Sequence, residues 1–392
     1  MLAARLLDVL LVLVLLVYLG EGLRNGFARS ISAILGVIAG GVIAFFLIPL
    51  LAGVVPDPFW RTFLVVASSA ALLLGGHALG AAVGRSLRAR RERLHPVDRV
   101  FGGLANLVVA ALVVGMIAGG IGALGVPVLS RAVANSTVLK GISAVTPDPV
   151  EAALAQLRST VLSEGLPSLP DPGGVTAPPT APTGPTDTAA LKRAAQSVVR
   201  INGTAYACGQ NQSGSGFVVS SGRVVTNAHV VAGVTQPVVE APNGQAIEAT
   251  VVYFDPHHDL AVLAVRGLDV APIAMGDDLG VGDRAVVDGY PYGGPFTTGA
   301  ARVLAVTHSP VDDVGDGGET VREIYSLAAD VKPGNSGGPL LAMDGRIAGI
   351  VFARSSDQAN LGYAMTDDEL APVVERAPGL SASVSSGACT RG

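Results

Sequence analysis

The sequence predicts a chain of two fold classes: an N-terminal all-α membrane domain with four transmembrane helices, followed by a C-terminal all-β domain. The 392 residues are 49% hydrophobic and only 15% charged, a composition that points to membrane segments. The long apolar runs lie before residue 127, whereas short β-like runs broken by Gly, Pro, Asn and Asp fill about residues 191–378. We therefore expect the membrane to hold only the residues before about 127.

Four apolar stretches define the predicted membrane domain, residues 1–126. Each is, or extends to, about the 20 residues that a helix needs to cross a bilayer. The stretches are Leu6–Tyr18, Ile31–Leu51, Phe63–Val83 and Leu104–Leu124. A signal peptide is the alternative for the first, since Arg5 precedes it, but no small-residue cleavage site follows before the next apolar run. We interpret it as an uncleaved span.

Glycines in these stretches have the spacing of close helix contacts, at Gly36–Gly40, Gly76–Gly80 and Gly80–Gly84. Small residues four apart let two membrane helices approach closely. The alternative is that glycine is simply frequent in membrane helices. The sequence supports both interpretations equally.

The distribution of arginines predicts the orientation of the spans in the membrane. The loop after the third stretch contains Arg85, Arg88, Arg90, Arg91, Arg93 and Arg99, and the loop after the first contains Arg24 and Arg29. Residues 49–60, between the second and third stretches, contain no Lys or Arg. Because basic loops stay in the cytoplasm, everything after the fourth span is predicted to lie outside, in a plasma-membrane protein with several spans.

Residues 127–165 are predicted to form an extracytoplasmic connector with one short amphipathic helix, because apolar residues recur at helical spacing from Val150 to Leu162. Residues 166–190 are a Pro-rich linker. Such a composition stays extended and does not bury a core, so we expect a spacer in front of the last domain, residues 191–392.

The stretch Gly334–Leu340 reads as a tight glycine-rich turn that carries one hydroxyl, that of Ser336. A nucleophilic serine needs a base for its proton and donors for the developing oxyanion. Flanking glycines allow backbone N–H groups, here those of Gly334 and Ser336, to turn inward as those donors. The turn alone is only suggestive, because glycine-rich turns with a serine are common.

A histidine and an aspartate in suitable settings lie upstream. His229 follows an apolar β run at the place where a strand should end, and Asp259 begins another run. The order His229, Asp259, Ser336 is that of a chymotrypsin-type triad, with the histidine as general base and the aspartate holding its tautomer. Asp255 is the rival acid, and Asp259 is preferred because it directly precedes the apolar run. His257 and His258 have no helical i, i+4 partner, so no metal site is predicted.

These motifs resemble the trypsin-like serine proteases, in the form shared with the HtrA/DegP group. The matching segments are Gly214–Val219, Thr226–Val231, Asp259–Leu263 and Gly334–Leu340. The resemblance implies a double β-barrel of chymotrypsin type, two six-stranded barrels with the triad between them. It also implies that Asp330, six residues before Ser336, would select basic side chains, although Val331–Pro333 departs from that pattern and follows the HtrA form.

The N-terminal half resembles the CvpA (colicin V production) membrane domain, and the whole arrangement resembles the actinobacterial membrane-anchored protease family MarP. That resemblance implies a periplasmic serine endopeptidase that cleaves cell-envelope proteins in acid or stress resistance, with a disulfide between Cys208 and Cys389. Because ionisation of a histidine base, with an unperturbed pKa of about 6.5, weakens the chemistry in acid, we expect acid to act on conformation, redox state or substrate supply.

Several other classes are disfavoured. The net charge of −5 and the lack of a basic patch interleaved with aromatics exclude nucleic acid as an expected partner. No cofactor is predicted. The alternative function is a membrane scaffold or transport-linked protein whose β-domain is regulatory or binds peptides.

Overall fold

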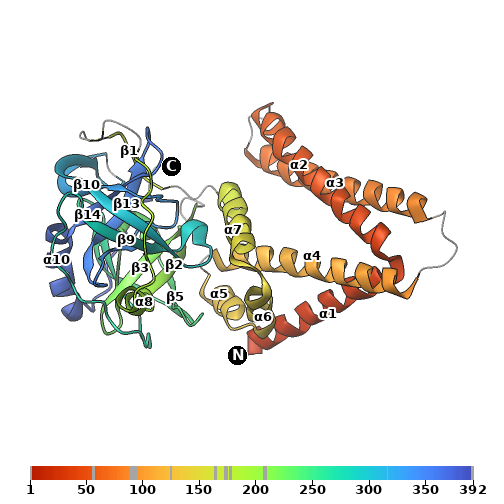
Figure 1. Cartoon of the computed structure of the whole chain (residues 1–392), viewed down its shortest axis with the longest axis horizontal. Helices are drawn as coiled ribbons and strands as arrows, with labels where there is room; N and C mark the ends of the chain where they lie inside the picture. Colours follow the sequence, from red (N-terminus) through yellow and green to blue (C-terminus); the bar gives the residue numbers. More distant parts are fainter. Residues whose placement is uncertain are drawn as a thin grey trace. The chain divides into compact units, whose positions relative to one another are not determined.

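The computed structural model describes residues 2–54, 58–88, 95–123, 126–162, 166–171, 175, 179–205, 210–315 and 317–389. The chain divides into two compact units, residues 6–115 and residues 1–5 with 116–392, and each is described by itself. Four long helices occupy the N-terminal region (Figure 1): α1 (Leu2–Asn25), α2 (Phe27–Val54), α3 (Pro58–Arg88) and α4 (Pro96–Ala123).

Two helical segments in the described residues, Ala3–Asn25 and Pro96–Gly122, are long and apolar enough to cross a membrane. The described apolar part of α2, Phe27–Ile43, is shorter. Leucine and valine side chains on α1 and α4, such as Leu10, Val17 and Val108, are more than half exposed, which suits contact with lipid. The structure thus confirms a helical N-terminal region with two clear apolar spans, and the four-span arrangement stays a prediction.

Of the two interpretations of the glycine spacing, close packing is present where α2 and α3 run side by side (Figure 1). A Cβ atom added at Gly36 would lie 2.1 Å from the carbonyl oxygen of Gly76, and one at Gly76 would lie 2.2 Å from the carbonyl oxygen of Gly36. Gly22 on α1 and Gly102 on α4 make a second contact of this kind, with 2.3 Å from an added Cβ to the Gly102 oxygen. Glycine therefore allows backbone-to-backbone packing at both helix pairs.

We expect Gly76→Val to lower the stability of the α2–α3 pair by about 1–3 kcal/mol, because the added side chain overpacks the crossing. Gly75→Val is the matched control, since a Cβ there meets no atom within 4 Å. The measurement is resistance to thermal unfolding in detergent, read by protease digestion of α2 and α3. Equal melting of the two variants would contradict the packing role of Gly76.

The connector contains three helices where the sequence predicted one: α5 (Pro127–Ala134), α6 (Thr137–Val145) and α7 (Asp148–Leu162). The predicted helix corresponds to α7. The two additional helices have local start signals: Pro127 occupies the first turn of α5, and the Ser136 side chain caps α6 by accepting a hydrogen bond from Leu139 N at 3.1 Å.

A seven-stranded sheet forms the first half of the β-rich domain. In pairing order its strands are β6 (Ala246–Glu248), β5 (Val238–Glu240), β2 (Val198–Ala205), β3 (Gln210–Ser220), β4 (Arg223–Thr226), β8 (Leu260–Ala264) and β7 (Thr250–Asp255). Every pairing in it is antiparallel. The alternating valines of these strands bury against Ile201, Leu263 and Leu268 in a cluster of their own.

A second seven-stranded sheet follows. Its order is β1 (Ser168–Leu169), β13 (Ile347–Ser355), β12 (Pro339–Ala342), β9 (Arg284–Gly289), β10 (Thr297–Asp312), β11 (Glu319–Ala328) and β14 (Leu361–Thr366). Because β13 also pairs with β14, all of these strands except β1 close into a ring. The first sheet has no such closing pair among the described residues, so the structure confirms a β-rich domain, while two six-stranded barrels stay a prediction.

Short helices complete this domain: α8 (Ala189–Ala195), α9 (Ala228–Val231), η1 (Pro291–Gly293), α10 (Asp367–Arg376) and η2 (Ala377–Gly379). The largest apolar cluster joins the two sheets, with Phe217 and Val262 from the first and Ile350 and Tyr363 from the second. Burial of this shared apolar face holds the two sheets together.

The linker is not purely a spacer. Residues 168–169 pair with β13 in parallel register, and Leu169 and Val175 pack on the shared apolar cluster. The proline-rich composition favours an extended backbone, and an extended backbone is what a strand edge can accept. The remaining described linker residues, before α8, form no helix or strand.

Candidate functional site

Ser336 lies in the turn between β11 and β12, and the backbone of this turn requires glycine. Gly334 has φ +92° and Gly337 has φ +80°, both in the left-handed region. A Cβ at Gly334 would come within 2.4 Å of the Tyr290 carbonyl oxygen, and one at Gly337 within 2.2 Å of Thr226 Oγ1. The turn is thus pressed between β9 on one side and the end of β4 on the other.

His229 and Asp259 form a tight buried pair. His229 lies in α9, directly after β4, and its Nδ1 is 2.8 Å from Asp259 Oδ2 and 3.1 Å from Oδ1. The His229 backbone N–H donates to the same carboxylate at 2.9 Å, and the Asn227 side chain donates to the Asp259 carbonyl at 2.9 Å. Asp259 has φ +52°, a conformation that a non-glycine residue adopts only when its surroundings enforce it.

The rival acid does not face the histidine. Asp255 accepts hydrogen bonds from the Tyr253 hydroxyl and from the backbone N–H groups of His257 and His258, so it is committed to its own turn. His257 Nδ1 lies 2.7 Å from Asp313, and His258 Nδ1 lies 3.1 Å from Asp255. Within the described part of the chain, no three His, Cys, Asp or Glu side chains gather where they could hold a metal ion.

Ser336 is brought to the histidine side of the domain and is 3% exposed. Gly214 lies between the two segments: an added Cβ there would meet Val230, the residue after His229, at 2.7 Å and the Ser336 carbonyl oxygen at 3.0 Å. The Ser336 hydroxyl donates to the Phe352 carbonyl at 3.5 Å. No hydrogen bond joins Ser336 Oγ to His229 among the described residues, which is common in proteases without substrate.

The two predicted oxyanion donors are available. The backbone N–H groups of Gly334 and Ser336 donate to no acceptor among the described residues, whereas the N–H groups of Asn335 and Gly337 bond to the carbonyls of Lys332 and Val351. Both groups therefore remain able to donate to a ligand, as an oxyanion would require, and their role as its donors stays a prediction.

Ser215 is a residue that sequence reasoning missed. Its hydroxyl donates to the Gly334 carbonyl at 2.7 Å and accepts from Tyr290 N at 2.9 Å, and its backbone N–H donates to the Ser336 carbonyl at 2.8 Å. One buried serine in β3 therefore ties the nucleophile turn to the first sheet. The sequence signal for Ser215 was its position between Gly214 and Gly216, in the segment Gly214–Val219 that resembles the HtrA/DegP group.

A buried carboxyl lies beneath the same turn. Asp288 in β9 is fully buried, its carbonyl oxygen would lie 2.2 Å from a Cβ at Gly338, and neither carboxyl oxygen makes a well-formed hydrogen bond within the described structure. Burial raises the pKa of the Asp288 carboxyl to about 7, only partly opposed by the Thr298 side chain. The group therefore changes charge between neutral and mildly acidic pH.

The remaining predicted residues lie apart from this centre or outside the described structure. The Asp330 side chain is 55% exposed and pairs with Lys332 Nζ at 2.8 Å, so its role in a substrate pocket stays a prediction. Cys389 lies against Gly233, where an added Cβ would be 2.9 Å from its Sγ. Cys208 lies outside the described residues, so its pairing with Cys389 also stays a prediction.

Comparison with protein families matches two regions of the chain. Residues 7–147 match the Colicin V production protein family, and residues 214–350 match the trypsin-like peptidase domain. The serine protease Rv3671c of Mycobacterium tuberculosis H37Rv is 32% identical over 98% of both chains. The Do-like serine protease HtrA of Lactococcus lactis subsp. cremoris is 33% identical, over 39% of this chain and 40% of its own.

Solved structures agree with these matches. The crystal structure of the Rv3671c protease from M. tuberculosis in its active form superposes with a TM-score of 0.52 at 36% identity. It covers 57% of this chain and 100% of that one.

Proposed function

Because this chain belongs to the family of membrane-anchored, trypsin-like serine proteases that includes M. tuberculosis Rv3671c, we propose that it hydrolyses peptide bonds of cell-envelope proteins through an acyl-enzyme on Ser336. The observation that carries this proposal is the buried His229–Asp259 pair, together with Gly214, where an added Cβ would meet both Val230, the residue after His229, and the Ser336 carbonyl oxygen. The unoccupied N–H groups of Gly334 and Ser336 supply the second requirement, stabilisation of the oxyanion.

The proposed reaction follows from these positions. With Nδ1 bonded to Asp259, the His229 ring is fixed in the tautomer that leaves Nε2 free to accept the Ser336 proton. Ser336 Oγ then attacks the scissile carbonyl, and the same imidazole returns the proton to the leaving amine. Water attacks the acyl-enzyme in the second half of the cycle by the same general-base route.

The test is covalent labelling of the full-length protein in detergent with a fluorophosphonate probe. We expect wild type to be labelled on Ser336 and Ser336→Ala to be unlabelled. Ser326→Ala, which removes another buried hydroxyl from the same domain, is the matched control and should label like wild type. Equal labelling of wild type and Ser336→Ala would favour the alternative, a membrane scaffold with a regulatory or peptide-binding β-domain.

We propose a multi-pass arrangement of four spans in the plasma membrane, with the protease domain on the periplasmic side. The support is the charge asymmetry of the loops: Arg24 and Arg29 after the first stretch, six arginines after the third, and no Lys or Arg in residues 49–60. An alkaline phosphatase fusion after residue 190 should be active, and the corresponding β-galactosidase fusion inactive. The reverse pattern would contradict this orientation.

We further propose that Cys208 and Cys389 pair in the oxidising periplasm. The support is that these are the two cysteines of the chain and that Cys389 packs beside Gly233 within the protease domain. Reduction of the denatured protein should raise the free-thiol count by two per chain, with alkylation before reduction as the reference. An unchanged count would refute the bridge.

A role in acid or stress resistance is also proposed. Its physical support is Asp288, whose buried carboxyl is neutral in mild acid and costs stability only when it ionises. The catalytic chemistry itself still requires a neutral histidine, so the advantage in acid would lie in the stability of the domain.

A further inference from the structure

Arg322 is a fully buried cation that the triad does not use. It lies in β11, and its Nε donates to the His257 carbonyl at 2.8 Å while Nη2 donates to the Asp312 carbonyl at 3.2 Å. Burial lowers the pKa of its guanidinium, and four surrounding carboxylates oppose this, those of Asp259, Asp313, Glu369 and Asp255. The guanidinium thus bridges the β10–β11 hairpin to the turn that precedes Asp259.

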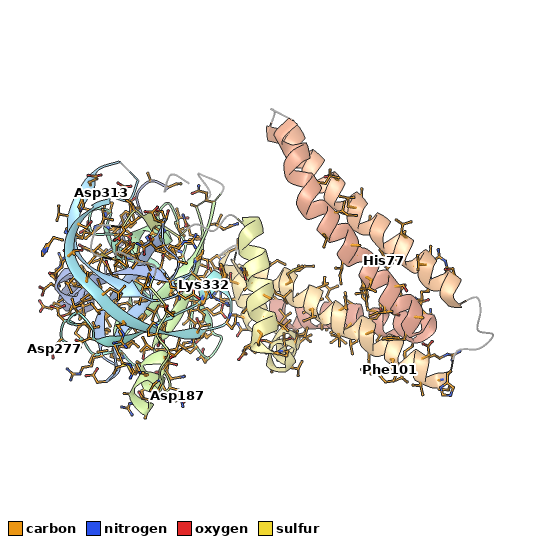
Figure 2. All side chains as sticks on the ribbon, turned by 45° about the horizontal axis from the view of Figure 1, so that its top comes forward. His77, Phe101, Asp187, Asp277, Asp313 and Lys332 are labelled. Carbon is orange, nitrogen blue, oxygen red and sulfur yellow. The ribbon has the colours of Figure 1, made fainter. Side chains whose placement is uncertain are left out.

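The same hairpin holds that turn by two further contacts. Val314 N donates to the Pro256 carbonyl at 2.9 Å, and His257 Nδ1 lies 2.7 Å from Asp313 Oδ2. Asp313 lies at the end of the hairpin, in the β-rich domain (Figure 2). The contacts come from the hairpin of the second sheet, whereas Asp259 directly precedes β8 of the first.

The turn decides where the Asp259 carboxylate points. Asp259 has φ +52°, an unfavourable backbone conformation that surrounding contacts have to maintain. A small rotation of this residue would move the carboxylate away from His229 Nδ1 and from the His229 backbone N–H, both within 2.9 Å of it now. Misplacement of a catalytic partner by about 1 Å costs on the order of 100-fold in rate.

We propose that Arg322 is a positioning residue for peptide hydrolysis: by binding the His257 carbonyl from the second sheet, it holds the turn that aims Asp259 at His229. This inference rests on the proposed function. Arg322 touches neither the serine nor the imidazole, so its effect on the reaction is indirect. It should appear in the turnover number and leave substrate affinity unchanged.

The test uses full-length Arg322→Met and Arg322→Lys in detergent. Competent sites are titrated with a fluorophosphonate, and kcat and KM are measured per titrated site. We expect Arg322→Met to lower kcat per site by about 10- to 100-fold with KM within twofold. Arg322→Lys keeps the charge and one donor group, the ammonium, so it should recover part of kcat. Arg302→Met, on the exposed face of β10, is the matched control and should behave like wild type.

A merely structural role would give a different result. In that case the number of titratable sites and the melting temperature would fall, but kcat per remaining site would equal that of wild type, and this outcome would overturn the proposal. If Arg322→Met does not fold, Arg322→Lys decides by the same criterion. Failure of the proposed function is distinguishable, because wild type itself would then neither label nor turn over.

An independent observation concerns the linker. Arg354 N donates to the Pro167 carbonyl at 3.1 Å, and Ser356 N donates to the Leu169 carbonyl at 2.9 Å, so linker residues 167–169 cover the outer edge of β13. Figure 1 shows β1 beside β13. The Ser356 hydroxyl adds a bond to the Leu169 carbonyl at 3.3 Å, and Leu169 packs on the apolar cluster.

This edge adjoins the nucleophile. Phe352, two residues before Arg354 on β13, has the carbonyl that accepts the Ser336 hydroxyl. An extended peptide lying across Ser336 would reach the N–H groups of the same edge, as in strand addition to a sheet. One strand edge accepts one partner at a time, so the linker and such a peptide exclude each other.

We also infer that residues 167–169 are an internal competitor, which lowers the affinity of the proposed protease for extended substrates. Like the first inference, this rests on the proposed function. The effect should depend on substrate length. A short ester that reaches only Ser336 does not need the edge, whereas a peptide of six or more residues does.

The test replaces residues 166–171 by Gly and Ser at constant length in the full chain. We expect KM for a long peptide to fall about tenfold, because the loss of the Leu169 anchor and of the proline-restricted backbone weakens the pairing of the linker with the edge, with kinetics on the short ester unchanged. The same replacement at residues 180–183 is the control. Leu169→Gly, which removes only the apolar anchor, should also lower KM for the long peptide. This variant replaces the larger replacement in the test if that one misfolds. Unchanged KM for the long peptide, or an equal change for both substrates, would overturn the inference.

Discussion

Replacement of Asp259 by asparagine is expected to lower kcat for peptide hydrolysis by about 10⁴-fold, with KM little changed. The amide keeps the size of the side chain but presents an N–H donor to His229 Nδ1, and this favours the imidazole tautomer that cannot accept the Ser336 proton. The buried geometry makes the effect large, because the carboxylate receives both Nδ1 and the backbone N–H of His229. Steady-state kinetics on one fluorogenic peptide measure it.

Asp255→Asn is the matched control for this experiment. Asp255 lies four residues earlier and is committed to Tyr253 and to the N–H groups of its own turn, so its replacement should change kcat by no more than a few-fold. A large loss in Asp255→Asn together with near-normal activity of Asp259→Asn would contradict the assignment of the triad acid.

Stability of the protease domain is expected to fall by about 4 kcal/mol as pH rises from 4 to 8, through the ionisation of Asp288. Its pKa is raised from 3.8 to about 7 by burial. Between these values the native state holds a proton that the unfolded state has released, so each unit of pH costs the native state free energy. Below about pH 3 both states are protonated, and the contribution no longer changes.

Asp288→Asn should remove this slope and raise stability at pH 8, since the amide has the same shape and no charge. Unfolding in urea, followed by hydrogen exchange of β9 peptides in the full-length protein, reports the free energy. The difference between wild type and Asp288→Asn isolates the effect of Asp288 from that of carboxyl groups whose ionisation stabilises the domain. Asp255 and Asp313 act in the opposite direction. Burial would raise the pKa of each carboxyl, but hydrogen bonds and neighbouring histidines outweigh it and lower the pKa, so protonation of these two groups in acid lowers the stability of the domain.

Asp269→Asn, at an exposed carboxylate, is the control and should keep the slope of wild type. If wild type and Asp288→Asn show the same pH dependence between 4 and 8, burial of Asp288 does not control stability. The proposed advantage in acid would then lose its physical support.

Local patterns predicted the parts of the molecule that depend on neighbouring residues. Apolar runs predicted one strand that ends before His229 and another next to Asp259, and these are β4 and β8. Turn glycines with positive φ, such as Gly334, were recognisable because few other residues adopt that backbone.

Long-range contacts were not recognisable in this way. Arginine is rarely buried, so nothing in the sequence marks Arg322 as a core residue. It is nevertheless fully buried, because carbonyls and carboxylates from other segments surround its guanidinium. The linker strand was missed for a similar reason. Its proline-rich composition carries no strand pattern, and the free edge of β13 supplies its hydrogen bonds.

The sequence by itself determined the class of the protein. Each of the proposed triad residues lies in a short motif of consecutive residues. The apolar composition of the N-terminal region predicts a membrane anchor. Only the tertiary structure decided which buried polar groups lie around the proposed triad: Ser215 bonded to the nucleophile turn, Arg322 bonded to the turn before Asp259, and Asp288 in β9 next to Gly338. The physical reason is burial. Whether a polar group is paired, charged or strained depends on the atoms around it, and here those atoms come from segments far apart in the chain.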